Sequence, residues 1–364
     1  MKYIYLFLIT LVVYCPTSYA ATFCVTTSAQ LQTALDDANV NNQDNLIKIT
    51  EGSYMTPGSQ FSYNLAGSNG GWDLEISGGW RFAMGFACNF QVPNPFATRL
   101  NGDTDNRVMQ IVVSNDFDLT VSNLTFQSGT ELTKLNNGAG LKVGTPTLVN
   151  SLGTFRLERC AFNLNDATFG SALSVAGFNT MRIQNNLFVG NHATEADGVV
   201  YLFQNNTNGI YFINNTVMLN SHGNSDYSAG VHINVLGSSN AAIYNNILWD
   251  NEGSDLLLSG NGKHYLSHND IGLRDGVAPF TNTENISVSP QFAGIPEFAL
   301  SQNSPLVNAG IKQPTFVPIP TPFDDDWNVG LFDFYRGDRI QNGKVDIGAV
   351  ETTPEVPIFM DGFE

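Results

Sequence analysis

Four polar residues of the types used in catalysis recur along the chain, and each directly follows an asparagine. At spacings of 26, 29 and 31 residues, they are Asp166, His192, Ser221 and Glu252. A second histidine, His222, follows Ser221. Carboxylates and imidazoles gathered at one site can act as general acid and base on a bound sugar. His192, His222 and Glu252 are therefore the candidate catalytic residues.

Further carboxylates in the same segments suggest a metal site. They are Glu195, Asp197, Asp226 and Asp255. Ca²⁺ prefers about six to eight oxygen ligands at roughly 2.3–2.6 Å, so several loops would have to contribute together. Ca²⁺ is the cofactor that this set would bind. The alternative is that these polar residues only decorate exposed loops.

Stacked coils would bring such loops together, and the chain repeats with a suitable period. Five segments align without gaps, at 123–129, 159–165, 185–191, 214–220 and 245–251. Each has an apolar anchor, and with a weaker sixth copy the anchors are Phe126, Phe162, Phe188, Val217, Leu248 and Ile271. Their spacings of 36, 26, 29, 31 and 23 residues suit one coil each, with loops of variable length. The sequence therefore predicts an all-β fold, a right-handed parallel β-helix solenoid.

Asparagine recurs in fixed columns beside these anchors. Two residues before an anchor stand Asn186, Asn215, Asn246 and Asn269. Asparagine tolerates the left-handed backbone of tight corners, and its amide can hydrogen-bond to the next coil. We expect these four residues to form a structural ladder. Cys160 occupies the same column, so we expect a buried free thiol there, whereas we expect Tyr211 to be exposed on the outer side of its strand.

The two ends of the solenoid need covers. Residues 27–39 carry apolar side chains at helical spacing, and Thr27 with Gln30 suggests a capping box, so we predict a short N-terminal capping helix. Cys24 and Cys88 flank this region, and we expect a disulfide between them. Residues 312–327, rich in Pro and Asp, mark the end of the regular coils, where we expect an irregular C-terminal cap.

The first twenty residues are typical of a secretory signal peptide. Lys2 precedes an apolar run, at 4–13, that is too short to span a bilayer. Ser18 and Ala20 then place small residues at the −3 and −1 positions, which predicts cleavage after Ala20. We expect bacterial export to the cell surface or medium, with no transmembrane segment in the mature chain. The predicted organisation is signal peptide 1–20, N-terminal cap and first coils 21–100, β-helix coils 101–310, closing segment 311–351, and linker with a short sorting-like tail 352–364.

The net charge limits the classes of molecule that the protein can bind. The chain has 16 Lys and Arg against 33 Asp and Glu, a net charge of −17. Such a surface repels phosphate backbones and anionic headgroups, so we expect no nucleic-acid partner and no passive membrane binding. We expect the protein to be a monomer.

The asparagine and aliphatic columns, over roughly residues 45–310, resemble those of the pectate-lyase-like β-helix superfamily. The C-terminal motifs are more specific: SPLVNAG at 304–310, then Asp333, Gly337 and Arg339, then NGKVDIGAVE at 342–351. Together they resemble the closing segment of choice-of-anchor Q proteins, which are exported β-helix proteins with varied anchoring tails. This resemblance implies export and a β-helix, and it implies no defined reaction.

Three functions are compatible with the sequence. The one we favour is a non-catalytic secreted or cell-surface β-helix protein that binds a polysaccharide, a cell-surface glycan or another surface. The second is a polysaccharide lyase or glycoside hydrolase acting in a groove on the β-helix, and the third is a purely structural surface protein. Whether the protein is an enzyme stays open at this level.

Overall fold

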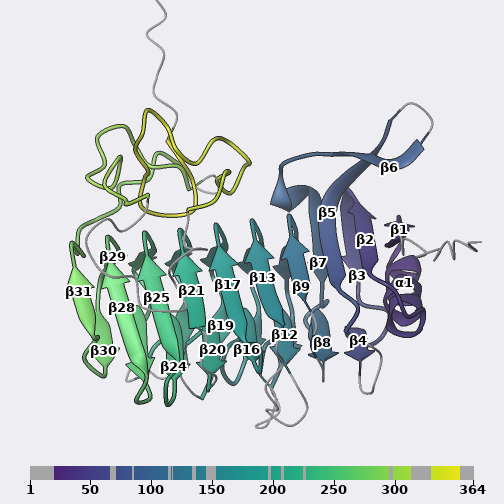
Figure 1. Ribbon diagram of the computed structural model, residues 1–364, viewed down its shortest axis with the longest axis horizontal. Helices are drawn as coiled ribbons and strands as arrows, with labels where there is room; N and C mark the ends of the chain where they lie inside the picture. The colour runs from purple at the N-terminus through teal and green to yellow at the C-terminus, as the bar shows by residue number, and fades with distance from the viewer. Residues whose placement is uncertain are drawn as a thin grey trace, which may run out of the picture.

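The described chain is a parallel β-helix, which confirms the predicted fold (Figure 1). The computed structural model describes residues 20–65, 71–83, 86–113, 116, 118–132, 137–144, 153–195, 198–205, 209–223, 227–294, 298–312 and 329–352. None of the described helices is long and apolar enough to cross a membrane. The described strands form four sheets, here named A to D, of which A, B and C run along the solenoid and D spans only four of its coils.

Successive coils stack one strand on the next in each sheet, so apart from β6 in sheet A the strands of a sheet are parallel. Sheet A contains β1 (Ala21–Val25), β2 (Asn45–Thr50), β5 (Leu74–Ala83), β6 (Phe86–Gln91), β9 (Leu119–Ser122), β13 (Thr154–Glu158), β17 (Thr180–Gln184), β21 (Gly209–Ile213), β25 (Asn240–Tyr244), β28 (Lys263–Ser267) and β31 (Thr281–Thr283). Sheet B contains β3 (Gly52–Met55), β7 (Thr98–Asn101), β10 (Thr125–Gln127), β14 (Ala161–Asn163), β18 (Leu187–Val189), β22 (Thr216–Met218), β26 (Ile247–Trp249) and β29 (Asp270–Ile271). A 3-10 turn, η1 (Pro95–Ala97), precedes β7.

The other side of each coil is formed by two further sheets. Sheet C contains β4 (Phe61–Leu65), β8 (Met109–Val113), β12 (Leu141–Gly144), β16 (Leu173–Ala176), β20 (Val200–Gln204), β24 (Val231–Val235), β27 (Leu256–Ser259) and β30 (Arg274–Gly276). The small sheet D contains β11 (Thr130–Glu131), β15 (Asp166–Ala167), β19 (His192–Ala193) and β23 (Ser221–His222). In sheet A, β6 alone among the described strands pairs antiparallel, with β5.

The anchors stack in register along the interior. Phe126, Phe162 and Phe188 are direct partners on consecutive strands, and their rings lie 4.9 and 4.8 Å apart between centroids. All three are fully buried. Since side chains alternate along a strand, the neighbouring residues face outward, and each outward column can carry a chemistry of its own.

The asparagine ladder lies at the corner between sheets A and B. Each amide Nδ2 donates to the Oδ1 of the next asparagine, at 3.0 Å from Asn186 to Asn215, 3.1 Å from Asn215 to Asn246 and 2.8 Å from Asn246 to Asn269. The same Oδ1 atoms also accept a backbone N–H of the preceding coil. Cys160 begins this column as a buried free thiol, and burial raises its pKa to about 12.

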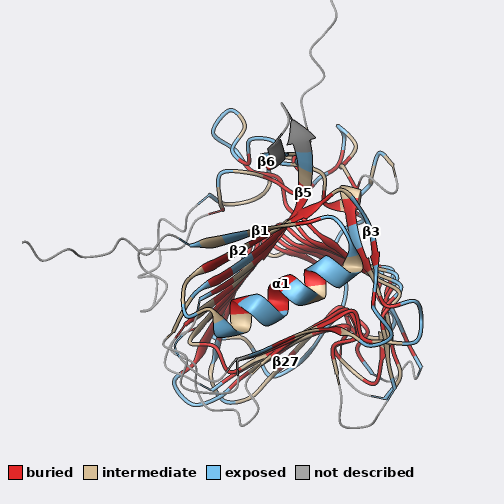
Figure 2. Ribbon diagram, turned by 90° about the vertical axis from the view of Figure 1, so that its right-hand side faces the viewer, coloured by how far each residue is buried: buried red, intermediate tan, exposed pale blue. Residues whose placement is uncertain are grey.

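One end of the coil is closed by the helix α1 (Ser28–Val40), which crosses the open end of the solenoid (Figure 2). Thr27 is the N-cap, and its side chain accepts from Gln30 N at 3.2 Å. Leu31 and Leu35 are fully buried against the first coil. The Cys24–Cys88 disulfide ties β1 to β6 beside this cap.

The described part of the irregular C-terminal segment does not cover the last coil. It folds back along the solenoid and covers the outer face of sheet B, where Leu187 and Met218 pack in one cluster with Phe334 and Val350 (Figure 1). The reason is composition: these outward residues of sheet B are apolar and need a cover. Three turn asparagines fix the segment through their Nδ2 atoms, with bonds of 2.8, 3.0 and 2.8 Å from Asn185 to Phe332 O, from Asn214 to Val329 O and from Asn245 to Ile311 O.

The C-terminal motif residues meet inside this segment. Arg339 is fully buried and forms an ion pair of 3.2 Å with Glu351. Asp333 accepts from Glu351 N at 3.0 Å, and Asp346 accepts from Asn308 N at 2.7 Å. Burial raises the pKa of Glu351 to about 7, and Arg339 opposes that rise. The motifs therefore hold the closing segment together and present no open site.

Tyr211 is not exposed, contrary to the sequence-based expectation. Its side chain faces outward from sheet A, yet it is only 2% exposed. It lies in an apolar cluster with Ile213, Ala242, Tyr244 and Tyr265 on neighbouring strands. This part of the outer face is thus packed by its own large side chains.

Candidate functional site

The structure brings together the first three predicted polar residues. Asp166, His192 and Ser221 are direct register partners on β15, β19 and β23. His192 Nδ1 lies 2.9 Å from Ser221 Oγ. Glu252 continues the series, since its backbone N donates to Asn220 O at 2.9 Å. Its carboxylate accepts from the backbone N–H of His222 at 3.0 Å.

His222 is separated from this outward column. It is 4% exposed, while Ser221 beside it is exposed, because consecutive residues of a strand face opposite sides. The His222 ring packs 5.3 Å from the ring of Tyr227. Of the two candidate histidines, His192 therefore lies in the outward column with Ser221, and His222 does not.

The predicted metal residues do not form a ligand set within the described residues. Asp255 is 4% exposed and ends a second asparagine ladder, formed by Asn165, Asn191, Asn220 and Asn251. Its Oδ1 accepts from both Asn251 N and Asn251 Nδ2, at 3.0 and 2.7 Å. Its Oδ2 accepts from Leu273 N at 2.8 Å, so we correct its predicted metal role to a structural one. Glu195 is exposed, and Asp197 and Asp226 lie outside the described residues. No group of three or more His, Cys, Asp or Glu in the described part could hold a metal ion.

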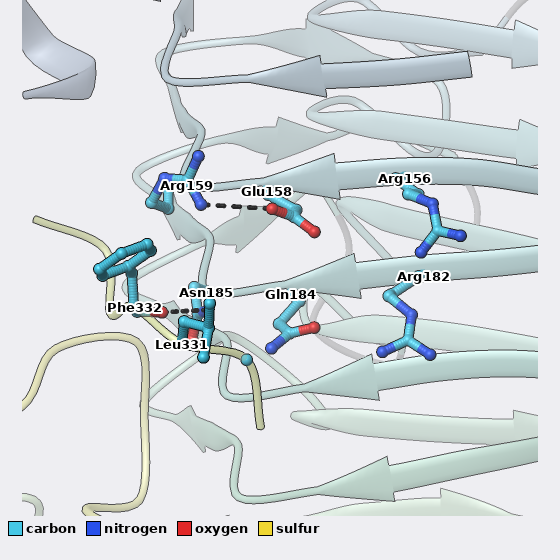
Figure 3. Close-up of a pocket in the computed structure, with 9 residues that line it drawn as sticks. Arg156, Glu158, Arg159, Arg182, Gln184, Asn185, Leu331 and Phe332 are labelled. Atoms are coloured by element: carbon cyan, nitrogen blue, oxygen red, sulfur yellow. Dashed lines mark hydrogen bonds and ion pairs between the residues drawn. The ribbon is translucent and has the colours of Figure 1, made fainter. Parts of the chain in front are cut away.

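A pocket of about 300 Å³ lies on the outer face of sheet A, beside the closing segment (Figure 3). Strands β13 and β17 form its floor, and the closing segment forms one wall. The lining residues are Arg156, Glu158, Arg159, Arg182, Gln184, Asn185, Gly330, Leu331 and Phe332.

Two arginines dominate the floor of this pocket. Arg156 and Arg182 are direct partners on neighbouring parallel strands, so two like charges lie side by side. No hydrogen-bond or ion-pair partner accompanies Arg156 within the described residues. Arg182 is 6% exposed, and its Cζ lies 4.8 Å from the ring centroid of Tyr211. The buried tyrosine, its register partner on the next strand, thus holds the guanidinium in place by a cation–π contact.

The wall of the pocket is fixed by close packing. Asn185 Nδ2 donates to Phe332 O at 2.8 Å. Gly330 has a φ of +81°, a left-handed conformation that favours glycine, and a Cβ there would lie 2.5 Å from Gln184 Nε2 and displace that amide. Leu331 is 79% exposed at the rim. The opening is therefore framed by an apolar side chain above a polar floor.

The charge of the pocket is opposite to that of the chain. Its lining has three arginines and one carboxylate, Glu158, which forms an ion pair of 3.2 Å with Arg159. The whole chain has a net charge of −17 and only 16 Lys and Arg. A positive concavity on such a protein favours anionic ligands.

A second pocket, of about 610 Å³, is less suited to an anion. It includes Arg107, Gln60 and Glu131 in its lining. Arg107 donates to Gln60 Oε1 at 2.6 Å and to Gly138 O at 2.9 Å, and it pairs with Glu131 at 3.1 Å. Burial lowers the pKa of Arg107, and Glu131 opposes this. The charge of Arg107 is therefore already balanced by Glu131 within the fold.

Sequence reasoning missed Arg156 and Arg182, although a signal was present. Each stands six residues before an anchor, Phe162 or Phe188, and Tyr211 stands six before Val217. Inspection of that column would have placed both arginines and the tyrosine on one outer row. Comparisons with protein-family models, with curated proteins and with solved structures find no match to this chain.

Proposed function

We propose that this protein is an exported β-helix protein that binds an anionic polysaccharide through the arginine pocket. The observation that carries the proposal is the side-by-side pair Arg156 and Arg182 in a cavity of about 300 Å³. Like charges directly opposite on neighbouring strands are destabilising. A bound anion between them would offset that repulsion.

Carboxylate groups are the ligand chemistry that fits best. A guanidinium offers a planar fork that matches a carboxylate with two parallel hydrogen bonds. The contact with Tyr211 limits the freedom of the Arg182 guanidinium, so less entropy is lost on binding. A chain of uronic acids carries carboxylates at regular intervals along an extended polymer, which suits arginines on successive coils.

Binding is favoured over cleavage at this pocket. A glycoside hydrolase needs two carboxyl groups roughly 5–9.5 Å apart. Among the described lining residues only Glu158 is a carboxylate, and it is paired with Arg159. These features support the non-catalytic binding role over a hydrolase at this place.

Export and surface attachment are part of the proposal. A disulfide such as Cys24–Cys88 forms and persists in oxidising compartments, which supports export. The resemblance to choice-of-anchor Q proteins supports attachment through the C-terminal tail, which lies outside the described residues. Expression with the tail from residue 352 deleted, followed by fractionation of cells and medium, tests this: release into the medium is expected.

The binding proposal is tested by calorimetric titration with oligogalacturonate, using a neutral oligosaccharide of equal length as the reference ligand. Arg156→Gln and Arg182→Gln should each weaken binding about 10-fold or more, because each removes charge-assisted hydrogen bonds. Arg274→Gln removes the same charge from an exposed site far from the pocket and should change affinity by less than about twofold. Equal binding of the neutral ligand, or unchanged affinity in both pocket variants, would contradict the proposal.

A further inference from the structure

Asp166, His192 and Ser221 stand on three neighbouring coils in sheet D. Their register partnership places the three side chains on one outer row. His192 Nδ1 lies 2.9 Å from Ser221 Oγ, and Asp166 flanks His192 on the opposite side. These residue types in this order are those that activate a serine nucleophile.

Asp166 is placed to act on the imidazole. The residue is half-buried, and its Oδ1 is buried with no hydrogen-bond partner among the described residues. Burial raises the pKa of Asp166, and the neighbouring His192 lowers it. When neutral His192 accepts at Nδ1 from Ser221, its proton is on Nε2, directed away from the serine. The carboxylate of Asp166, on the coil opposite Ser221, interacts electrostatically with His192, so it would stabilise the ring when it becomes positively charged.

The nucleophile is open to a polymer. Ser221 is exposed, and Glu252 on the next coil binds the backbone N–H of His222. Tyr227, 44% exposed, packs its ring against His222, the residue that follows Ser221 in the chain. Aromatic faces of this kind contact the apolar faces of sugar rings. An extended chain lying along the solenoid could therefore bring a substituent to Ser221.

We propose that this Ser–His–Asp column hydrolyses carboxylic esters, with acyl groups on a polysaccharide as the substrate class. Ser221 Oγ forms a bond to the acyl carbon while its proton moves to His192 Nδ1. The ester C–O bond then breaks, and the leaving sugar oxygen takes that proton to become a hydroxyl. His192 then takes a proton from a water molecule, which attacks the acyl carbon. The bond from that carbon to Ser221 Oγ breaks, His192 returns the proton to Ser221, and the carboxylic acid leaves. The reaction consumes only ester and water.

The chain offers a matched control for this column. His232 Nε2 lies 2.7 Å from Ser259 Oγ, so it also forms a histidine–serine hydrogen bond. The register partners of His232 are Tyr201 and Leu257, so neither position beside it on the neighbouring coils is an aspartate. His232 is 8% exposed. A mere histidine–serine contact is thus present there without the third group and without access.

The experiment measures hydrolysis of p-nitrophenyl acetate and labelling by a fluorophosphonate, with the labelled residue identified by mass spectrometry. The full mature chain is expected to be labelled at Ser221. Ser221→Ala should lower hydrolysis about 100-fold, and His192→Ala should abolish labelling although Ser221 is still present. Asp166→Asn should slow labelling about 10-fold, with recovery in Asp166→Glu, as expected for a positioning residue.

The control Ser259→Ala should keep full hydrolysis and full labelling at Ser221. Thermal melts of each variant establish that the coils remain folded. Absence of an adduct on Ser221, or equal labelling in wild type and His192→Ala, would overturn the proposal. Since Ser221 lies on sheet D and the arginine pocket on sheet A, loss of esterase activity and loss of polysaccharide binding are separable in the same variants.

Discussion

The asparagine ladder and the arginine pair show the same stacking geometry with opposite energetic consequences. In the ladder, each side chain carries both a donor and an acceptor, so every amide satisfies the next coil and is satisfied in turn. In the pocket, Arg156 and Arg182 carry only donors and the same charge, so stacking leaves them unsatisfied by each other. A solenoid repeats whatever it places in a column. Columns of self-complementary residues stabilise the fold, and columns that repel themselves indicate a ligand.

The largest effect should come from breaking the ladder. Asn215→Leu removes bonds to Asn186 and Asn246 and to Ile183 O, and it leaves buried donors and acceptors unpaired. We expect a loss of about 3–5 kcal/mol in the free energy of unfolding. Denaturant melts measure it, with Asn163→Leu, on the half-buried outer side of β14, as the control. Similar losses in the two variants would mean that the ladder has no special weight.

The next effect concerns the tyrosine that packs against the arginine pair. Tyr211 is buried in an apolar cluster, and its ring also contacts the guanidinium of Arg182. Tyr211→Ser should therefore cost about 3 kcal/mol in unfolding free energy, through lost burial and a cavity. It should also weaken binding of oligogalacturonate, because Arg182 loses its support. A stability change below about 1 kcal/mol would show that the outer face is looser than the structure indicates.

The interior could be predicted from sequence because its periodicity is constrained twice. An anchor such as Phe162 must be apolar to fill the core and must recur once per coil to stack. The ladder residue Asn186 must also fit a tight corner, where Asn185 before it has a φ of +56°. These requirements leave a readable column in the sequence. The predicted register Phe162 to Phe188 is the one observed.

The outer faces could not be predicted as well, because a strand's alternation does not say what covers its outer side. Tyr211 alternates as an exposed residue would, yet neighbours such as Tyr244 cover it. The sequence made Asp255 a candidate metal ligand, and only the structure shows that its carboxylate accepts a hydrogen bond from Asn251. Leu187 is an apolar residue on the outer side of its strand, and the residue that covers it, Phe334, is too distant in sequence to identify by pattern.

The smallest expected effect tests the comparison most directly. Without ligand, Arg156→Gln removes one of two opposed like charges and no hydrogen bond within the described residues, so the unfolding free energy should stay unchanged or rise by about 0.5 kcal/mol. The same variant should lose the thermal stabilisation that oligogalacturonate gives to the wild type, since that gain follows from binding to the folded state. Raising the salt concentration should reduce the ligand effect in wild type and narrow the stability difference between the two proteins, because both arise from charge. A marked loss of stability on Arg156→Gln in the absence of ligand would mean that Arg156 holds the coils together. The pair would then belong with the ladder as a structural column, and the case for a binding site would fail.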